Sequence, residues 1–199
     1  MERYRYPSPD EWKSITERPH IDTVALHSTV RNILEDVKAK GDKEMENAVN
    51  SVPTELLEAL TLAHKNISTF HASQRITTHK VETAPGVECW QKSVPITTVG
   101  LYVPGGTAPL FSTVLMLATP AKIAGCPNII MCTPPRRDGS VNPAILAAAR
   151  IAGVDKIYKA GGVQAIAGMA YGTESIHKVF KIFGPGNSYV MAAKQIVSL

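Results

Sequence analysis

Hydrophobic residues recur at helical spacing in two stretches of the first half of the chain. Residues 23–40 carry apolar side chains three or four positions apart and are followed by a glycine, which predicts a helix. A second amphipathic helix is predicted over residues 53–73, where a proline opens the first turn. Residues 80–92 alternate around Pro85-Gly86, which indicates a β-hairpin. We therefore expect residues 1–100 to form a scaffold of helices and a hairpin.

The second half, residues 101–199, alternates between short β-branched runs and helical stretches rich in Ala, Leu and Val. A turn rich in Gly or Pro separates each run from the helical stretch after it, and the runs recur at the spacing of βαβ units. Four such units predict an α/β fold with a parallel, doubly wound sheet. The predicted strands cover residues 97–103, 128–132, 156–159 and 179–183, and the predicted helices cover residues 110–124, 143–152, 163–171 and 188–198.

Charge is distributed unevenly along the chain, although its formal net value is only +4. Residues 1–100 carry 12 Lys and Arg against 14 Asp and Glu, whereas residues 101–199 carry 9 against 3. Apart from Gly41 and Gly86, all glycines lie from position 100 onward. An acid-poor, glycine-rich half is typical of a site for an anionic ligand. The basic residues are scattered and lack interleaved aromatic residues, which argues against a nucleic-acid partner.

The chain carries no signal for a membrane or for secretion. It has no run of about 18 apolar residues, and its first residues lack the apolar core of a signal peptide. The three cysteines, Cys89, Cys126 and Cys132, form no C-x-x-C pair, so reduced thiols in a cytoplasmic protein are expected. The histidines form no H-E-x-x-H motif. No metal ligand and no catalytic residue is therefore predicted within the chain.

Three glycine-containing turns at predicted strand ends form the candidate ligand site. In doubly wound folds, ligands bind beyond the carboxyl ends of the strands, where helix N-termini present free N–H groups. The turn Y-V-P-G-G-T begins at Tyr102, which is alternatively a plain core residue. The turn G-G-V-Q ends at Gln164, whose amide can recognise a ribose or a carboxamide, or can simply face solvent. The turn G-P-G-N ends at Asn187, which is alternatively a simple N-cap.

None of these turns completes an ordinary nucleotide-binding fingerprint. No Lys-Ser/Thr pair follows the first turn at the Walker A distance, and the third glycine of G-x-G-x-x-G is missing after G-P-G-N. The acidic residue that holds a ribose about twenty positions further on is also missing. The motifs therefore indicate a cofactor site of another kind.

Three long motifs in the same order resemble the histidinol dehydrogenase family. The first is V-G-L-Y-V-P-G-G-T-A-P-L-F-S-T-V-L-M-L-A-T-P-A-K-I-A-G-C at residues 99–126. The others are G-G-V-Q-A-I-A at residues 161–167 and K-I-F-G-P-G-N at residues 181–187. The resemblance extends back through residues 65–71 and the Pro85-Gly86 hairpin, and so covers nearly the whole chain.

The resemblance implies an enzyme that oxidises L-histidinol to L-histidine through an aldehyde stage, the last step of histidine biosynthesis. Members of the family use two NAD⁺ and a zinc ion, act as homodimers, and contain Rossmann-like domains related to those of aldehyde dehydrogenases. Carried over to the matching positions, the family's NAD contacts are Tyr102, Gln164 and Asn187. The second half is accordingly expected to be the NAD-binding domain.

The chain departs from the family's pattern in two places. It ends at Leu199, about half-way through the pattern, so the resemblance implies an N-terminal portion whose zinc ligands and acid–base residues lie beyond residue 199. The link between Gly41 and Pro53 is also shorter than the family's segment there. One alternative is a truncated NAD-binding or dimerisation domain without catalysis. Another is an aldehyde-dehydrogenase-like enzyme that uses Cys132 as its nucleophile.

Overall fold

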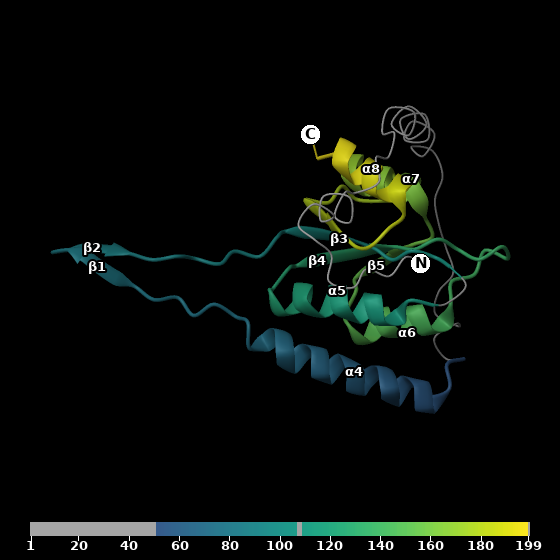
Figure 1. Cartoon of the computed structure of the whole chain (residues 1–199), viewed down its shortest axis with the longest axis horizontal. Helices are drawn as coiled ribbons and strands as arrows, with labels where there is room; N and C mark the ends of the chain where they lie inside the picture. Colours follow the sequence, from purple (N-terminus) through teal and green to yellow (C-terminus); the bar gives the residue numbers. More distant parts are fainter. Residues whose placement is uncertain (1–50, 107–108, 199) are drawn as a thin grey trace, which may run out of the picture.

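The structure, a computed structural model, describes residues 51–106 and 109–198. These residues form a long helix, a projecting hairpin and a four-stranded parallel sheet flanked by helices (Figure 1). The helix predicted over residues 23–40 lies outside the described residues. The elements are α4 (Thr54–Ala72), β1 (Val81–Ala84), β2 (Val87–Cys89), β3 (Thr98–Tyr102), α5 (Phe111–Ile123), β4 (Asn128–Cys132), α6 (Pro143–Ile151), β5 (Lys156–Tyr158), α7 (Gly162–Tyr171), β6 (Lys181–Phe183) and α8 (Ser188–Ile196).

The sheet is doubly wound, as the alternation of strands and helices predicts. Its strand order is β5-β4-β3-β6, and every neighbouring pair is parallel. Helices α5 and α6 cover one face, whereas α7 and α8 cover the other (Figure 1). The apolar side chains accordingly form two clusters, one on each face. Numbered in sequence order, the four strands lie 3-2-1-4, which matches the first four strands of the Rossmann order 3-2-1-4-5-6.

Helix α4 forms where the amphipathic pattern predicts it and packs against the sheet domain. Pro53 caps its start, and its apolar face lies against α5 and α6 (Figure 1). Val52 and Leu60 are buried in the same cluster as the α5 and α6 side chains. The predicted boundary after residue 100 falls inside β3. The division into a scaffold and an NAD-binding domain stays a prediction.

The predicted hairpin forms and projects from the body as an arm (Figure 1). All residues of β1 and β2 are exposed, and Val81 pairs with Cys89. Gly86 at the turn has φ +82°, and its N–H donates to Glu82 Oε1 at 2.8 Å. Because a two-stranded hairpin alone is marginal in water, local contacts matter. Lys80 provides two of them, pairing with Glu88 at 2.7 Å and lying 5.2 Å from the Trp90 ring centroid.

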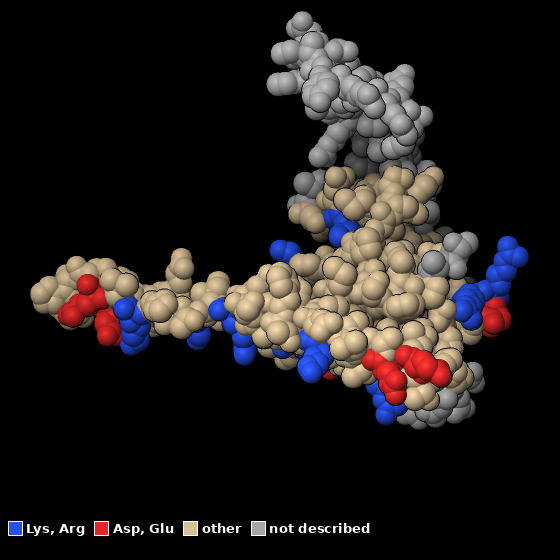
Figure 2. All heavy atoms as spheres, turned by 60° about the horizontal axis from the view of Figure 1, so that its bottom comes forward, with Lys and Arg blue, Asp and Glu red and all other residues tan. Residues whose placement is uncertain are grey.

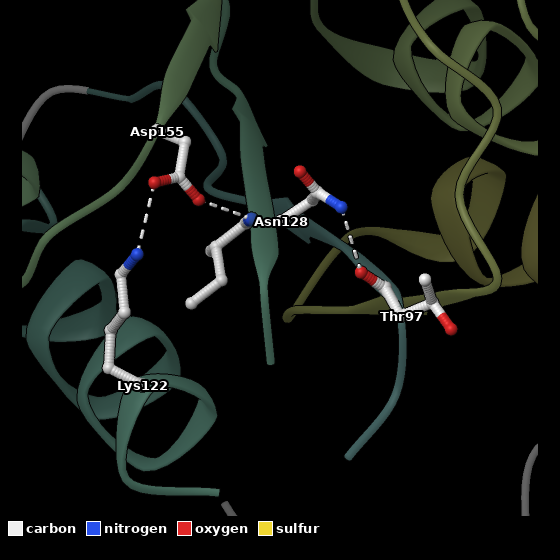
Figure 3. A network of polar contacts seen from close by, with 5 residues as sticks. Thr97, Lys122, Asn128 and Asp155 are labelled. Atoms are coloured by element: carbon white, nitrogen blue, oxygen red, sulfur yellow. Dashed lines mark hydrogen bonds and ion pairs between the residues drawn. The ribbon is translucent and has the colours of Figure 1, made fainter. Parts of the chain in front are cut away.

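A polar network ties the amino ends of the strands together (Figure 3). Asp155 accepts from the Ile129 N–H at 2.6 Å and pairs with Lys122 Nζ at 3.0 Å. Asn128 Nδ2 donates to the Thr97 carbonyl at 3.2 Å. These contacts join the end of α5 to the starts of β4 and β5. They lie at the edge opposite to the glycine-containing turns.

Candidate functional site

The glycine-containing turns gather at the carboxyl edge of the sheet, because all four strands run parallel. The chain leaves β3 through Pro104-Gly105-Gly106 and leaves β4 through a Pro-Pro turn. It enters α7 through Gly161-Gly162 and α8 through Gly184-Pro185-Gly186-Asn187. This edge therefore carries all three residues that the sequence singles out.

Tyr102 ends β3 and joins two of these turns. Its side chain is 4% exposed and packs among apolar residues on the α7 and α8 face. Its hydroxyl oxygen accepts a hydrogen bond from the Gly162 N–H at 3.0 Å. The Tyr102 ring is thus a core residue, as one alternative proposes, while its hydroxyl oxygen reaches the N-terminus of α7. The hydroxyl still has a proton of its own to donate.

Gln164 lies exposed in the first turn of α7. The turn before it needs glycine, because Gly162 has φ +60° and a Cβ added there would lie 3.1 Å from Gln164 Oε1. The Gln164 amide therefore lies over the start of its own helix. There it offers both a donor and an acceptor beside the free N–H groups of the first turn.

Asn187 is the N-cap of α8, which is one of the two roles that the sequence predicts for it. Its Oδ1 accepts from the Val190 N–H at 3.1 Å, while the residue itself is exposed. Lys194 of the same helix donates to the Gly184 carbonyl at 3.2 Å and holds the preceding turn in place. Capping uses only the side-chain oxygen, so the Asn187 amide nitrogen keeps two donors.

The glycines let the turns pack directly on one another. A Cβ added at Gly105 or at Gly161 would lie 2.5 Å from Pro134, which sits between the two turns. A Cβ at Gly184, where φ is +137°, would collide with the Tyr102 carbonyl oxygen. Gly106 differs, because nothing lies within 4 Å of an added Cβ. Most of these glycines thus serve the contact between turns, and Gly106 borders open space.

A cavity of about 190 Å³ opens at this edge between the turns that follow β3 and β4. It is smaller than the ~300 Å³ of a site that holds a whole drug-sized ligand, so it fits one part of a larger molecule. Of its lining, the sequence singles out residues 104–106 as part of the Y-V-P-G-G-T turn, but not the Pro-Pro turn after β4, which carries no known fingerprint. The cavity is lined by residues 104–106, 109, 133–136, 141, 142 and 145.

Cys132, at the end of β4, is fully buried, and burial raises the pKa of its thiol to about 12. Because the thiolate is the nucleophilic form, this thiol stays protonated and unreactive near neutral pH. The structure thus argues against an aldehyde-dehydrogenase-like mechanism that uses Cys132.

The described residues offer no place for a zinc ion. Within residues 51–106 and 109–198, no three His, Cys, Asp or Glu side chains gather as metal ligands. None of the helices in that same part of the chain is both long and apolar enough to span a bilayer. Figure 2 shows one face of the molecule, where basic side chains lie apart from one another with acidic ones among them.

Comparison with known proteins places the chain among dehydrogenases. The family model for histidinol dehydrogenase matches residues 41–199. The chain belongs to the histidinol dehydrogenase family. It is 56% identical to the histidinol dehydrogenase of Bacteroides thetaiotaomicron, in an alignment that covers 100% of this chain and 52% of that protein. It is 44% identical to the enzyme of Salmonella typhimurium, over 96% of this chain and 48% of the relative.

A solved structure supports the same conclusion about the fold. The crystal structure of histidinol dehydrogenase from Elizabethkingia anophelis superimposes with a TM-score of 0.88 at 44% identity. The match covers 96% of this chain and 49% of that one. The chain thus spans about half the length of the curated histidinol dehydrogenases it matches. The family and the α/β fold that the sequence motifs predict are both confirmed.

Proposed function

We propose that the chain is the N-terminal portion of a histidinol dehydrogenase and that its carboxyl sheet edge binds NAD⁺. The single observation that carries the cofactor site is the bond between Tyr102 and the Gly162 N–H, which joins the end of β3 to the start of α7. This bond ties two of the motif turns together, and Asn187, in the turn after the parallel strand β6, lies at the same edge. An edge of a doubly wound sheet that carries free amides is where nucleotides bind.

The donors and acceptors present suit a dinucleotide. Gln164 offers an exposed amide, and Asn187 keeps two donors beyond its capping bond. Tyr102, buried and fixed, holds the Gly162 backbone and so sets the direction of the first turn of α7. When bound, NAD⁺ supplies a nicotinamide ring that accepts a hydride. The chain's own residues bind and orient that cofactor.

In the whole enzyme, the proposed reaction is oxidation of L-histidinol to L-histidine via histidinal with two NAD⁺, in a cytoplasmic homodimer. Zinc belongs to this proposal through the family resemblance, which implies ligands beyond residue 199. Within residues 51–106 and 109–198, no His, Cys, Asp or Glu cluster fits the ion. No step through zinc therefore follows from this chain. The chain alone is expected to form no NADH from histidinol. NADH formation by the chain alone would contradict that expectation.

Calorimetric titration of the chain with NAD⁺ tests the cofactor site. Wild-type chain is expected to bind saturably, and Gln164→Ala and Asn187→Ser to bind about tenfold more weakly, because each loses amide hydrogen bonds. Serine keeps the cap of α8, so Asn187→Ser retains the fold. Gln195→Ala is the matched control, since Gln195 is exposed near the other end of α8. Saturable binding that neither variant weakens would refute the site.

A further inference from the structure

A cavity of about 560 Å³ lies at the amino edge of the sheet, where the two legs of the hairpin arm, residues 73–80 and 90–97, leave the body (Figure 1). Its lining comes from the end of α4, from both legs and from the end of α5. Its volume falls within the range of roughly 300–1,000 Å³ that holds a whole small ligand. Tyr102, Gln164 and Asn187 take no part in the lining. The cavity is therefore separate from the proposed cofactor site.

The inner wall of this cavity is apolar and belongs to the body of the protein. Cys126 is 6% exposed and lies in the core cluster on the α5 and α6 face, and Ile96 packs against that cluster. Ile123, half-buried near the end of α5, continues the wall. No backbone–backbone hydrogen bond joins residues 76–79 to residues 91–96, so the two legs run apart on either side of the cavity. The wall thus offers an apolar surface to a ligand between the legs.

The polar groups that line the cavity are mainly hydrogen-bond donors. Gln74 Oε1 lies 2.7 Å from His71 Nδ1, and because an amide oxygen only accepts, the Gln74 Nε2 group keeps two free donors. Arg75 adds a guanidinium with five donors, which forms no ion pair and no hydrogen bond with the described residues. The hydroxyls of Thr78 and Ser93 have no hydrogen-bond partner in the same part of the chain. A ligand rich in acceptors suits this lining.

The positive charge of Arg75 has no acidic partner in the lining. Every lining residue belongs to residues 59–81 or 89–137, and neither run contains an Asp or a Glu. Asp155 at the same edge of the sheet is already bound to the Ile129 N–H at 2.6 Å. A guanidinium matches a carboxylate with two parallel hydrogen bonds. The charge and the apolar wall together therefore indicate an anion with an apolar body.

We propose that this cavity binds a small organic acid, an apolar body that carries one carboxylate. The Arg75 guanidinium and the Gln74 amide nitrogen bind the carboxylate, and the wall of Ile96 and Ile123 receives the body. Such a ligand contacts α4, both legs of the arm and α5 at once, and so holds the base of the arm against the body. The inference goes beyond the proposed function and does not depend on it.

Calorimetric titration of the full chain with 4-phenylbutyrate, and separately with the uncharged 4-phenyl-1-butanol, tests the inference. The acid is expected to bind saturably, and the alcohol about tenfold more weakly, because it lacks charge-assisted hydrogen bonds. Arg75→Gln is expected to weaken the acid about tenfold and to leave the alcohol unchanged. Lys65→Gln is the matched control, since it removes a positive charge of α4 outside the lining. No saturable binding of the acid, equal affinity for both probes, or equal losses in both variants would overturn the proposal.

A second variant tests the cavity itself. Ala124 is an exposed lining residue with ordinary helical backbone angles, φ −68° and ψ −11°, so Ala124→Leu is expected to fold. The larger side chain narrows the cavity, and both probes are expected to bind several-fold more weakly. Unchanged binding of 4-phenylbutyrate to Ala124→Leu would refute the cavity as the site. Displacement of 4-phenylbutyrate by NAD⁺ would place it at the carboxyl edge and would equally overturn the proposal.

Discussion

At the scale of single residues, the candidate site is organised by contacts between turns. Tyr102 contributes a buried ring and one hydroxyl bond, and Pro134 fills the space that Gly105 and Gly161 leave. The sequence shows the glycines but does not show what they pack against. From the sequence, glycines in these turns suggest that the backbone approaches a ligand closely. In the structure, the backbone at Gly105 and Gly161 instead approaches Pro134 of a neighbouring turn.

Replacing Tyr102 with Phe removes the acceptor of the Gly162 N–H and keeps the ring in the core. We expect the free energy of unfolding to fall by about 1–2 kcal/mol, because a half-buried N–H loses its partner. Urea unfolding measures this change. Tyr189→Phe, at a side chain 47% exposed on α8, is the control and is expected to change little. Equal stability of the two variants would show that the Tyr102 bond contributes nothing.

Cys132 gives a prediction that depends on pH. Its folded pKa of about 12 lies above the ordinary 9.0, so the folded state binds its proton more tightly than the unfolded state. The resulting stability is complete below pH 9.0 and is lost as the pH rises toward about 12. The free energy of unfolding of Cys132→Ala, measured over that range, is expected to decline less steeply with pH than that of the wild type. Parallel declines would contradict the burial of the thiol.

At the scale of elements, periodicity predicts most of what the structure contains. The hairpin and α4 form where the pattern places them, and each strand and helix of the sheet agrees with its prediction to within about two residues. The strand order is not encoded in that periodicity, since it depends on which face each helix covers. The network around Asp155 is equally hidden, because its partners lie 26 and 33 residues away.

Asp155→Ala tests how much that network contributes to the sheet. We expect a loss of about 2–3 kcal/mol in unfolding free energy, mainly because the buried Ile129 N–H loses a charged acceptor. Lys122→Ala removes only a half-exposed ion pair and is expected to cost at most about 1 kcal/mol. Thermal or urea unfolding separates the two. Equal losses would mean that the ion pair, and not the backbone bond, carries the contribution.

At the scale of the whole molecule, large apolar side chains remain on the surface. Ile76 and Val94 near the base of the hairpin arm are exposed, and Phe180, just before β6 at the end of the sheet, is 81% exposed. We expect such side chains to contact further protein where they form a contiguous apolar patch. The relatives are about twice as long as this chain, which agrees with such contacts. Sequence periodicity predicted the hairpin but not its projection from the body.

The central claim is that the carboxyl sheet edge binds NAD⁺ through the three motif turns. Backbone amide NMR of the isotope-labelled chain, recorded during titration with NAD⁺, tests it most directly. Saturable shifts confined to the neighbourhood of Tyr102, Gln164 and Asn187 are predicted, with the amides around Asp155 at the opposite edge unchanged. Shifts that centre on any other surface, or no saturable shift at high NAD⁺, would contradict the claim.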